Sequence, residues 1–423
     1  MTACMAMGLP AHAADASISS IKPQVAASVT LESLQQTALE YSPVIAAERL
    51  SMTAAQARQI IARAYPNPNV EVLSGNSKLR PTGTDNGRAR EFTLSQPLEW
   101  PDARSARIAS ADAMVDATQF GTALLINDVL SNVRLRAFEW MIRQEEIRNL
   151  QESLQLLEQM RQRVFVRVDT GEAAKSDLIR ADAELLSTRA KLNAARASAN
   201  SLRLLLSEVV GVALPDDLMI QTPMRMKADL NEALQKLKAL EDTNPELKQR
   251  RREVAASRLR YDEQVALRKP TVQLQAKRQT ELDLTLNQLG FAIDVPIFDR
   301  RTGQVRQALA QADQSELLLQ ARRHALVQQA NSAYARLEAA QRQVEALETG
   351  VLKQAQAALA VAEAAYRYGE RGILDTLDAQ RVLRSVLADL AQARLEALTS
   401  ATELDRLAGI YATAYFAQPT DKE

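Results

Sequence analysis

The chain has 423 residues, of which 46% are hydrophobic and only 4% are aromatic. Its 52 Lys and Arg residues balance its 52 Asp and Glu residues, so the composition gives no sign of a nucleic-acid partner. The 13 glycines and 14 prolines are about half of the usual share, and two windows, 102–214 and 297–418, contain no proline. These windows are rich in Ala, Leu, Gln, Arg and Glu, which predicts very long helices.

Residues 1–13 are predicted to be a secretion signal. Ala11-His-Ala13 matches the pattern of a cleavage site, and Met1–Pro10 is mostly small or apolar. No basic segment precedes them, so we expect the true start codon to lie further upstream. Cys4 is a poor match to an acylation site and would be discarded with the signal. No apolar run approaches the ~20 residues of a membrane-spanning helix, so any membrane would have to be crossed by strands.

The segment 14–211 is the first predicted unit, and it begins with helices. Ser42-Pro43 predicts a helix start with Pro in its first position. Phe92-Thr-Leu-Ser-Gln96 alternates apolar and polar residues, as a half-buried strand does, so a β-hairpin is expected at about 68–98. A long helical hairpin is expected at about 102–211. Within the β-hairpin, the polar connection between the two strands is predicted at about 73–88.

The same order of patterns begins again after a predicted linker at 212–230. Asn244-Pro245 corresponds to Ser42-Pro43 at an offset of 202 residues, and Gly369 corresponds to Gly171 at an offset of 198. The offset changes by only four residues between these two matches, which indicates a duplicated chain. The second unit is predicted to span 231–416. It is expected to contain a β-hairpin at about 270–298, with its connection at about 277–286, and a helical hairpin at about 301–412. A tail is expected at 417–423.

Both helical hairpins carry apolar residues spaced three and four apart, which is typical of coiled coils. The predicted seams are Leu192, Ala195, Ala199, Leu202 and Leu206 in the first hairpin, and Leu337, Ala340, Val344, Leu347 and Val351 in the second. Gly171 and Gly369 are predicted to let the chain turn between antiparallel helices. We therefore expect two helical tips.

Two aspartates, Asp375 and Asp378, follow the second tip. Residues three apart share one face of a helix. In an assembly of several chains they would form rings of carboxylates, which narrow a pore and select cations. The alternative is a pair of acidic residues in the first turn of a helix, where the helix dipole favours negative charge. Asp177 fits this alternative better, because the first unit has Arg180 where a second aspartate would stand.

Four strands in one chain cannot close a barrel. In lipid every backbone polar group must be bonded within the protein, so several chains would have to share one barrel. Two chains would supply eight strands and three chains twelve. Because eight-stranded barrels are filled by their own side chains, a conduit favours three chains.

Four motifs carry a resemblance to a known family. They are Pro66-Asn-Pro-Asn-Val70, Gln96-Pro-Leu-Glu-Trp-Pro101, Val295-Pro-Ile-Phe-Asp-Arg-Arg-Thr-Gly303, and Tyr368-Gly followed by Leu374-Asp-Thr-Leu-Asp-Ala379. With them, the whole mature chain resembles the TolC family of outer-membrane efflux proteins. It is similar in particular to the branch that works with heavy-metal and drug exporters.

The resemblance implies a mainly α fold with a small transmembrane β-barrel contribution. The implied assembly is a homotrimer in the outer membrane of a Gram-negative bacterium, with a twelve-stranded barrel and a twelve-helix periplasmic tunnel. Its implied partners are a periplasmic adaptor protein, an inner-membrane pump of RND or ABC type, and outer-membrane lipid. The expected function is a passive exit duct for metal ions or small toxic compounds. Two alternatives are an exit duct for type I protein secretion and a secreted coiled-coil scaffold without a pore.

The same resemblance assigns roles to three groups of residues. Asp375 and Asp378 would line the periplasmic aperture. The tip residues that would dock the adaptor are Gly171, Glu172, Tyr368, Gly369, Glu370 and Gly372. The strand-helix junctions are marked by Pro68, Pro97, Trp100, Pro101, Pro270 and Pro296.

No catalytic residue, cofactor or protein-bound metal is expected. The mature chain would contain a single histidine, His324, and no cysteine, which excludes a His/Cys metal site. Three methionines in the linker, Met219, Met224 and Met226, are compatible with contact to a soft metal. The simpler interpretation is that they pack the linker against the helices.

Overall fold

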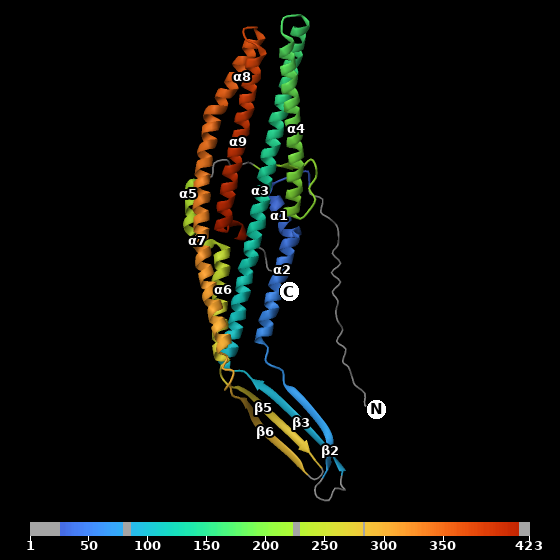
Figure 1. Ribbon diagram of the computed structural model, residues 1–423, viewed down its shortest axis with the longest axis vertical. Helices are drawn as coiled ribbons and strands as arrows, with labels where there is room; N and C mark the ends of the chain where they lie inside the picture. The colour runs from blue at the N-terminus through green and yellow to red at the C-terminus, as the bar shows by residue number, and fades with distance from the viewer. Residues whose placement is uncertain (1–25, 79–85, 223–228, 282–283, 414–423) are drawn as a thin grey trace.

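The computed structural model describes residues 26–78, 86–222, 229–281 and 284–413. The molecule is a long rod of helices with a small sheet at one end and two helical tips at the other (Figure 1). This arrangement separates the two groups of residues that the sequence singles out. The strand-helix junctions lie at the sheet end, and the tips with Asp375 and Asp378 lie at the opposite end.

The same order of elements occurs twice along the described chain. The first half contains β1 (Ser28–Val29), α1 (Leu31–Tyr41), α2 (Pro43–Arg63), β2 (Asn69–Lys78), β3 (Asn86–Leu98), α3 (Pro101–Asp169) and α4 (Lys175–Val210). The second half contains β4 (Met219–Ile220), α5 (Leu230–Thr243), α6 (Pro245–Ala266), β5 (Thr271–Thr280), β6 (Thr285–Asp294), α7 (Thr302–Ala346), the π-helix η1 (Leu347–Val351), α8 (Leu352–Arg367), α9 (Ile373–Ala408) and the 3-10 helix η2 (Ile410–Ala412).

Local chemistry sets where several helices begin. Pro43, Pro101 and Pro245 are the first residues of α2, α3 and α6, where the missing N–H would have had no acceptor within the helix. Thr30 and Ser33 cap α1 reciprocally, because each hydroxyl accepts a hydrogen bond of 3.1 Å from the other residue's N–H. These starts are therefore properties of the sequence itself.

Two pairs of shorter helices meet end to end. Gly211 and Gly409 follow α4 and α9 with φ angles of +87° and +74°. A Cβ atom on Gly211 would lie 2.7 Å from the carbonyl oxygen of Tyr41, and one on Gly409 would lie 2.7 Å from Cδ of Pro245. Glycine is thus required where α4 meets α2 and where α9 meets α6. Each stacked pair runs beside a long helix, α3 in the first half and α7 in the second (Figure 1).

The sheet joins the two halves of the chain. Its strands lie in the antiparallel order β2, β3, β5, β6. The central pair β3–β5 runs from Arg90 opposite Thr280 to Leu98 opposite Val272. β2 and β6 are the edge strands, and in the described part of the chain no further strand pairs with them. One chain therefore leaves both edges of the sheet open.

The predicted strand connections, about 73–88 and 277–286, are too long. β2 and β3 pair throughout Asn69–Lys78, and β5 and β6 pair throughout Thr271–Thr280. The polar residue Ser74, for example, lies in the ladder opposite Arg90. Polar residues here belong to extended strands, so their composition was a poor guide to a turn.

A second, small sheet was not predicted. β1 and β4 pair in parallel, with Ser28 opposite Met219 and Val29 opposite Ile220. This contact ties the beginning of the described chain to the segment between the two halves. Strands of two residues are too short to show an alternating pattern, so the sequence carried no usable signal for them.

The predicted seams are correct in the first hairpin and only in part in the second. In α4, Leu192, Ala195, Ala199 and Leu206 are buried and Leu202 is partly buried. In α7, Leu337, Ala340 and Val344 are buried. Val351, however, is 46% exposed. It lies at the end of the π-helix η1, whose wider turn rotates the following residues, so that burial resumes at Ala355 and Leu359.

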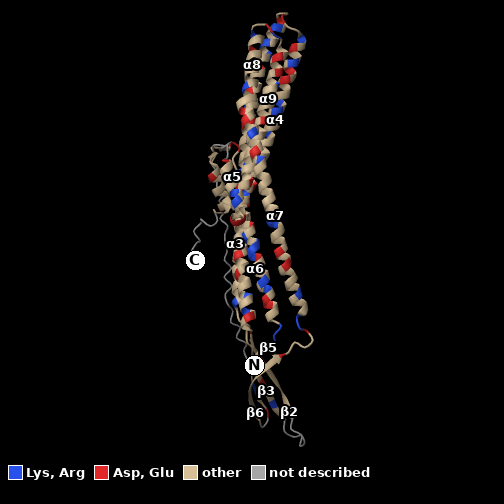
Figure 2. Ribbon diagram, turned by 90° about the vertical axis from the view of Figure 1, so that its left-hand side faces the viewer, with Lys and Arg blue, Asp and Glu red and all other residues tan. Residues whose placement is uncertain are grey.

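Figure 2 shows acidic and basic residues intermingled along the helices and around the tips. Many of these charges form ion pairs between helices, such as the pair that Arg394 of α9 makes with Glu145 of α3 and Glu348 of η1, both at 2.7 Å. Within the described ranges, no helix combines the length and the apolar character needed to cross a membrane.

Candidate functional site: the helical tips and the aspartate pair

Each helical hairpin turns at a glycine in the left-handed conformation. Gly171 has a φ angle of +80° and Gly369 one of +75°. Their N–H groups donate to the carbonyl oxygens of Val168 and Tyr366, both at 3.1 Å, which satisfies the ends of α3 and α8. No atom lies within 4 Å of the position of a Cβ on Gly171, so this glycine is required by conformation alone.

The two tips lie side by side (Figure 1). Arg167, near the end of α3, places its guanidinium 5.3 Å from the centre of the Tyr366 ring and donates to the Tyr366 carbonyl at 3.5 Å. It also forms an ion pair of 3.8 Å with Glu172. A Cβ on Gly369 would touch Arg167 at 3.4 Å. A single arginine therefore bridges the predicted tip residues of both hairpins.

The predicted docking residues at the tips are accessible. Tyr368 is 78% exposed, and Glu172, Glu370 and Gly372 are also exposed. Gly372 has extended backbone and precedes α9. These residues surround the turns without contributing to the buried core.

Asp375 and Asp378 lie in the first turns of α9 and both are exposed. The carboxylate of Asp375 pairs with Arg371 at 3.2 Å, in an exposed ion pair of one helical turn. Asp378 has no ion pair among the described residues. The pair thus shares one solvent-facing side of α9, as their spacing predicts.

The opposite side of the same turns is completely buried. Ile373 and Leu377 pack into a cluster with Leu157, Met160 and Val164 of α3. Thr376 is 0% exposed, and its hydroxyl donates a hydrogen bond to the carbonyl of Ala362 at 3.2 Å. After Leu377, the next buried residue along α9 is Gln380. This packing gives the aspartate side of α9 a fixed orientation relative to α3 and α8.

Gln380 is a buried polar residue at a seam position. It is 2% exposed, and its side-chain amide donates to the carbonyl oxygen and to the hydroxyl of Ser153 on α3, at 3.3 and 3.1 Å. Its own amide oxygen is buried without a hydrogen-bond partner. A directional contact of this kind specifies the register between two helices more sharply than apolar packing does.

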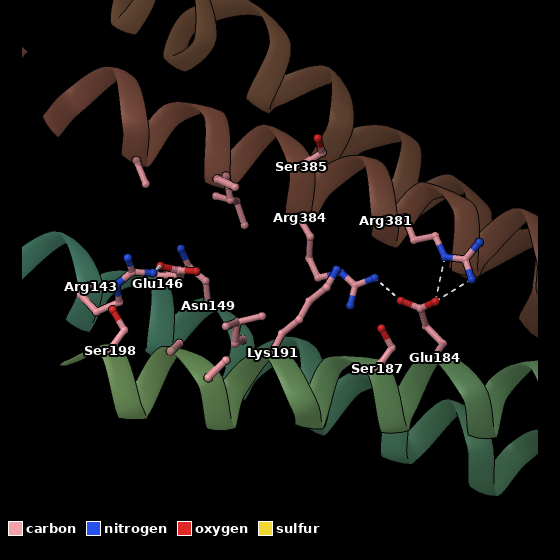
Figure 3. Close-up of a pocket in the computed structure, with 16 residues that line it drawn as sticks. Arg143, Glu146, Asn149, Glu184, Ser187, Lys191, Ser198, Arg381, Arg384 and Ser385 are labelled. Carbon is pink, nitrogen blue, oxygen red and sulfur yellow. Dashed lines mark hydrogen bonds and ion pairs between the residues drawn. The ribbon is translucent and has the colours of Figure 1, made fainter. Parts of the chain in front are cut away.

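One turn further, two arginines of α9 hold a buried glutamate of α4. The Glu184 carboxylate accepts hydrogen bonds from Arg381, at 2.7 Å, and from Arg384 (Figure 3). The Glu184 side chain is 6% exposed and that of Arg384 12% exposed, whereas Arg381 is 57% exposed. Arg384 also donates to the hydroxyl of Thr188. We refer to Glu184, Arg381, Arg384 and the Gln380–Ser153 pair as the α9 clamp.

The electrostatics of the α9 clamp are dominated by burial and by the two arginines. Burial acts to raise the pKa of Glu184, but the hydrogen bonds from Arg384 and Arg381 outweigh it and hold that pKa below its usual value. Arg384 and Lys191 extend into the space between α9 and α4 (Figure 3), along an open groove of about 820 Å³. The carboxylate therefore stays ionised at neutral pH.

The α9 clamp was not predicted from the sequence. The available signal was a polar residue, Gln380, at a position that continues the apolar spacing of Ile373 and Leu377. For Glu184 there was no such signal, because its partners lie 197 and 200 residues away along the chain. Only the packing of α4 against α9 brings them together.

The predicted strand-helix junctions meet at the opposite end of the molecule. Trp100, which precedes α3, donates from its indole nitrogen to the carbonyl oxygen of Pro270 at 2.8 Å. Lys269 lies 5.4 Å from the Trp100 ring and pairs with Asp102 at 2.5 Å. The contact joins the entry of α3 to the entry of β5. The remaining junction prolines are Pro68 before β2, Pro97 within β3, Pro101 at the start of α3 and Pro296 after β6.

Several predictions concern residues outside the described ranges. These are the signal at 1–13 with Cys4, the tail at 417–423, and Met224 and Met226. Met219 is described and is 64% exposed. Across the described parts of the chain, no group of three or more His, Cys, Asp or Glu residues is arranged to hold a metal ion.

Known proteins are similar to this chain in both sequence and fold. A family model described as "Outer membrane efflux protein" matches residues 34–212 and 237–410. The cobalt-zinc-cadmium resistance protein CzcC of Cupriavidus metallidurans is 28% identical over 362 residues, which cover 82% of each chain. The solved outer-membrane channel OprN has a TM-score of 0.78 at 19% identity, covering 90% of this chain and 89% of its own. The open state of the Neisseria gonorrhoeae MtrE outer-membrane channel has a TM-score of 0.74 at 18% identity, covering 90% and 88%.

The family match extends through both halves, from α1 through α4 and from α5 through α9. It includes both helical tips, the aspartate pair and all four strands of the larger sheet. At their low identity, the structural likenesses show a shared fold. From the family match, the chain belongs to the outer membrane efflux protein family.

Proposed function

We propose that this protein is the passive exit duct of a tripartite efflux system. It acts as a homotrimer whose sheets share one barrel in the outer membrane and whose helices form a tunnel in the periplasm. The observation that carries the proposal is the polarity of the rod. A sheet with two open edges stands at one end, and an exposed aspartate pair stands at the other (Figure 1).

The open sheet supports an assembly of several chains. β5 and β6 each have ten residues, the length that a tilted strand needs to cross a bilayer. Leu289, Phe291 and Ile293 lie on one side of β6 and are each more than half exposed. Because strand edges in lipid must be paired, β2 of one chain would pair with β6 of the next. Three chains would supply twelve strands, enough to leave a conduit.

The aspartate pair supports a selective aperture. Three copies of Asp375 and Asp378 around the axis would concentrate negative charge at the narrow end of the tunnel. Arg371 neutralises part of this charge through its ion pair with Asp375. Asp378, without such a pair among the described residues, would carry the larger part of the cation preference.

The tips support docking of a periplasmic adaptor. Tyr368, Glu370 and Glu172 are exposed around two turns that Arg167 holds side by side. The adaptor would in turn connect the duct to an inner-membrane pump of RND or ABC type. The cargo that we propose is metal ions or small toxic compounds, since CzcC, by its name, provides cobalt, zinc and cadmium resistance.

The family is one of outer-membrane efflux channels and not of enzymes. This membership favours the exit duct over the coiled-coil scaffold without a pore. A scaffold would also have no use for strands that expose apolar side chains.

The decisive experiment is single-channel conductance of the purified protein in a planar bilayer. The wild type should give small, cation-selective steps. The Asp375→Ala/Asp378→Ala variant should give larger steps with reduced cation preference, because the carboxylate ring that narrows and charges the aperture is gone. Asp177→Ala is the matched control, since Asp177 occupies the first turn of α4 as Asp375 does in α9.

Two results would count against the proposal. Steps identical in the wild type and the double variant would retain the channel but remove the aspartate aperture. If correctly folded protein never inserts into the bilayer, the exit duct itself is wrong.

A further inference from the structure

The four strands of the larger sheet have one apolar side and one polar side. In β3, Phe92, Leu94 and Leu98 fall on one side and Glu91 and Thr93 on the other, because successive residues of a strand alternate. We call the apolar side the outward side, since a barrel in a membrane turns its apolar side to the lipid. Residues directly opposite each other in a ladder share a side. The exposed apolar residues that continue the outward side on the other strands are Val70, Val72, Leu274, Leu289, Phe291 and Ile293.

Three arginines also lie on the outward side. Arg88 and Arg90 share the side of Phe92 on β3, and Arg278 of β5 stands directly opposite Phe92. All three are exposed, and they lie toward the strand ends that are farthest from the helices (Figure 1). Arg90 is opposite Thr280, so Arg90 and Arg278 are diagonal neighbours, roughly 7–8 Å apart. We refer to these three arginines as the outer arginine cluster.

The acidic residues of the same strands lie on the polar side. Glu91 follows Arg90 directly and therefore points the other way, where its carboxylate pairs with Lys277 at 2.6 Å. Glu71 and Asp294 share this polar side. Over the described parts of the four strands, the outward side carries no Asp or Glu, and the outer arginine cluster forms no ion pair with any described residue. Like charges that stand together repel each other, so the cluster favours an anion from outside the chain.

The depth of the outer arginine cluster in the membrane indicates which anion this is. An arginine that faces lipid is destabilising at the middle of the bilayer and is tolerated near its interfaces. From Leu98 to Arg88, β3 rises by about 34 Å, or about 26 Å along the membrane normal at a tilt of about 40°. This rise matches the apolar band of such barrels, which is about 25 Å tall. With the helices on the periplasmic side, the cluster lies at the head groups of the outer leaflet.

We propose that Arg88, Arg90 and Arg278 bind the phosphate groups of lipopolysaccharide, the phosphorylated glycolipid of the outer leaflet. Guanidinium groups suit this ligand, because they donate two parallel hydrogen bonds to one phosphate. The acyl chains of the same lipid would lie along Phe92 and Val72, which continue the outward side next to the cluster. The inference goes beyond the proposed function and rests on its placing of the sheet in the outer membrane.

The test measures the binding of lipid A, the diphosphorylated lipid portion of lipopolysaccharide, to the full-length protein. Native mass spectrometry in a neutral detergent gives the affinity, and EDTA is present so that no divalent cation bridges the phosphates. The Arg88→Gln/Arg90→Gln/Arg278→Gln variant should bind lipid A at least about tenfold more weakly than the wild type, because each basic residue near an anionic head group adds to the affinity. Arg90→Gln alone should show a smaller loss, and it serves in case the triple variant does not assemble.

A matched control lies on the same strand. Lys277 precedes Arg278 in β5, but it lies on the polar side and already pairs with Glu91. Lys277→Gln removes the same charge as Arg278→Gln and should bind lipid A as the wild type does. If Lys277→Gln weakens binding as much as Arg278→Gln, the effect is one of net charge and the inference is wrong.

The lipid is varied as well as the protein. Lipid A without its phosphates should bind the wild type as weakly as diphosphorylated lipid A binds the triple variant. Phosphatidylglycerol, an anionic phospholipid with a single phosphate, should also bind weakly. Equal affinity of the wild type for phosphorylated and dephosphorylated lipid A, or for lipid A and phosphatidylglycerol, would overturn the inference.

Conductance separates this inference from the proposed function. The outer arginine cluster faces away from the polar side of the sheet, so the triple variant should keep wild-type conductance and selectivity while it loses lipid A. Unchanged lipid A affinity in both the triple variant and Arg90→Gln would contradict the lipid site and leave the duct intact. If the wild type forms no channels but loses lipid A when the cluster is replaced, the duct is wrong and the lipid site stands.

Discussion

Glu184 shows how a single residue couples two parts of the chain. Its carboxylate is almost fully buried, and it remains ionised because two arginines donate to it. Each of these arginines is contributed by the other helical hairpin. Protonation of a buried carboxylate of this kind breaks a buried ion pair, which costs more free energy than the loss of an exposed pair.

This burial leads to a prediction of pH dependence. The pKa of Glu184 is lower in the folded protein than its ordinary value of 4.5, so the unfolded chain binds a proton more readily. The stabilisation from this pair should be complete above about pH 4.5 and should be lost as the pH falls further through the folded pKa. Thermal unfolding of the wild type, measured from pH 7 to pH 3, should therefore show a steeper acid loss than that of Glu184→Leu/Arg384→Met.

Other charges face the same groove and must be considered. They are Arg143 and Glu146 of α3, Lys191 of α4, and Arg381 and Arg384 of α9. Glu146 is present in both proteins, so it does not contribute to a difference between them. Parallel curves for the two proteins would contradict the assignment of the acid-sensitive stability to Glu184.

At the scale of the element, the ends of helices matter as much as their faces. α3 has 69 residues and a length of about 104 Å, whereas α2 and α4 must be stacked to reach a comparable length. The stacking is possible because Gly211 has no side chain to clash with Tyr41 and Ser42. The continuity of the rod therefore depends on one glycine in each half.

The contrast between two glycines gives a stability prediction. Gly171→Ala places a side chain in the left-handed region with open space around it, which should cost about 1–2 kcal/mol. Gly211→Ala adds contacts of 2.7 Å to the Tyr41 oxygen and 2.9 Å to the Ser42 Cα, both backbone atoms. Its unfolding midpoint in urea should therefore fall clearly below that of Gly171→Ala. Equal midpoints would show that α4 does not rest tightly on α2.

The π-helix η1 is a second feature at the scale of the element. It contains Glu348, Thr349 and Gly350, and Arg394 of α9 binds the first of these. Glycine and β-branched residues weaken an α-helix, which makes this stretch the easiest place to accommodate a wider turn. The turn shifts the buried face of α8 relative to α7, so the two segments present different seams.

At the scale of the whole molecule, the open sheet predicts contacts between chains. In the order β2, β3, β5, β6, the edge strands are three strand spacings apart, about 14 Å. A disulfide requires Cα atoms within about 7 Å, so one between β2 and β6 must join two chains. Val72→Cys combined in turn with Asn287→Cys, Leu289→Cys, Phe291→Cys or Ile293→Cys should yield covalent trimers in at least one case, seen on a non-reducing gel.

The control for this experiment lies within the sheet. Val72 stands directly opposite Phe92 in the β2–β3 ladder, so Val72→Cys/Phe92→Cys should close a disulfide within one chain and give monomers on the gel. The shared barrel is wrong if all four β2–β6 pairs also give monomers only.

Much of the fold followed from local chemistry. Proline at the first position of α2, α3 and α6, and left-handed glycines after α4 and α9, act within a few residues, so the sequence is enough to place them. The sequence also predicted that Asp375 and Asp378 share one side of α9, because the helical repeat places residues three apart on one face. The seam prediction is wrong at Val351. A π-turn differs only slightly in energy from an α-helical turn, and no pattern of apolar residues reveals it.

The sequence by itself determined the duplication, the long helices, their turns and the placing of two aspartates beyond the second tip, since each depends on backbone preferences or periodicity. Tertiary structure alone decided that β3 pairs with β5, that the tips meet through Arg167, and that Glu184 receives Arg381 and Arg384. These contacts join residues between 174 and 200 positions apart. Their free energy depends on geometry and burial, which only the packed chain defines.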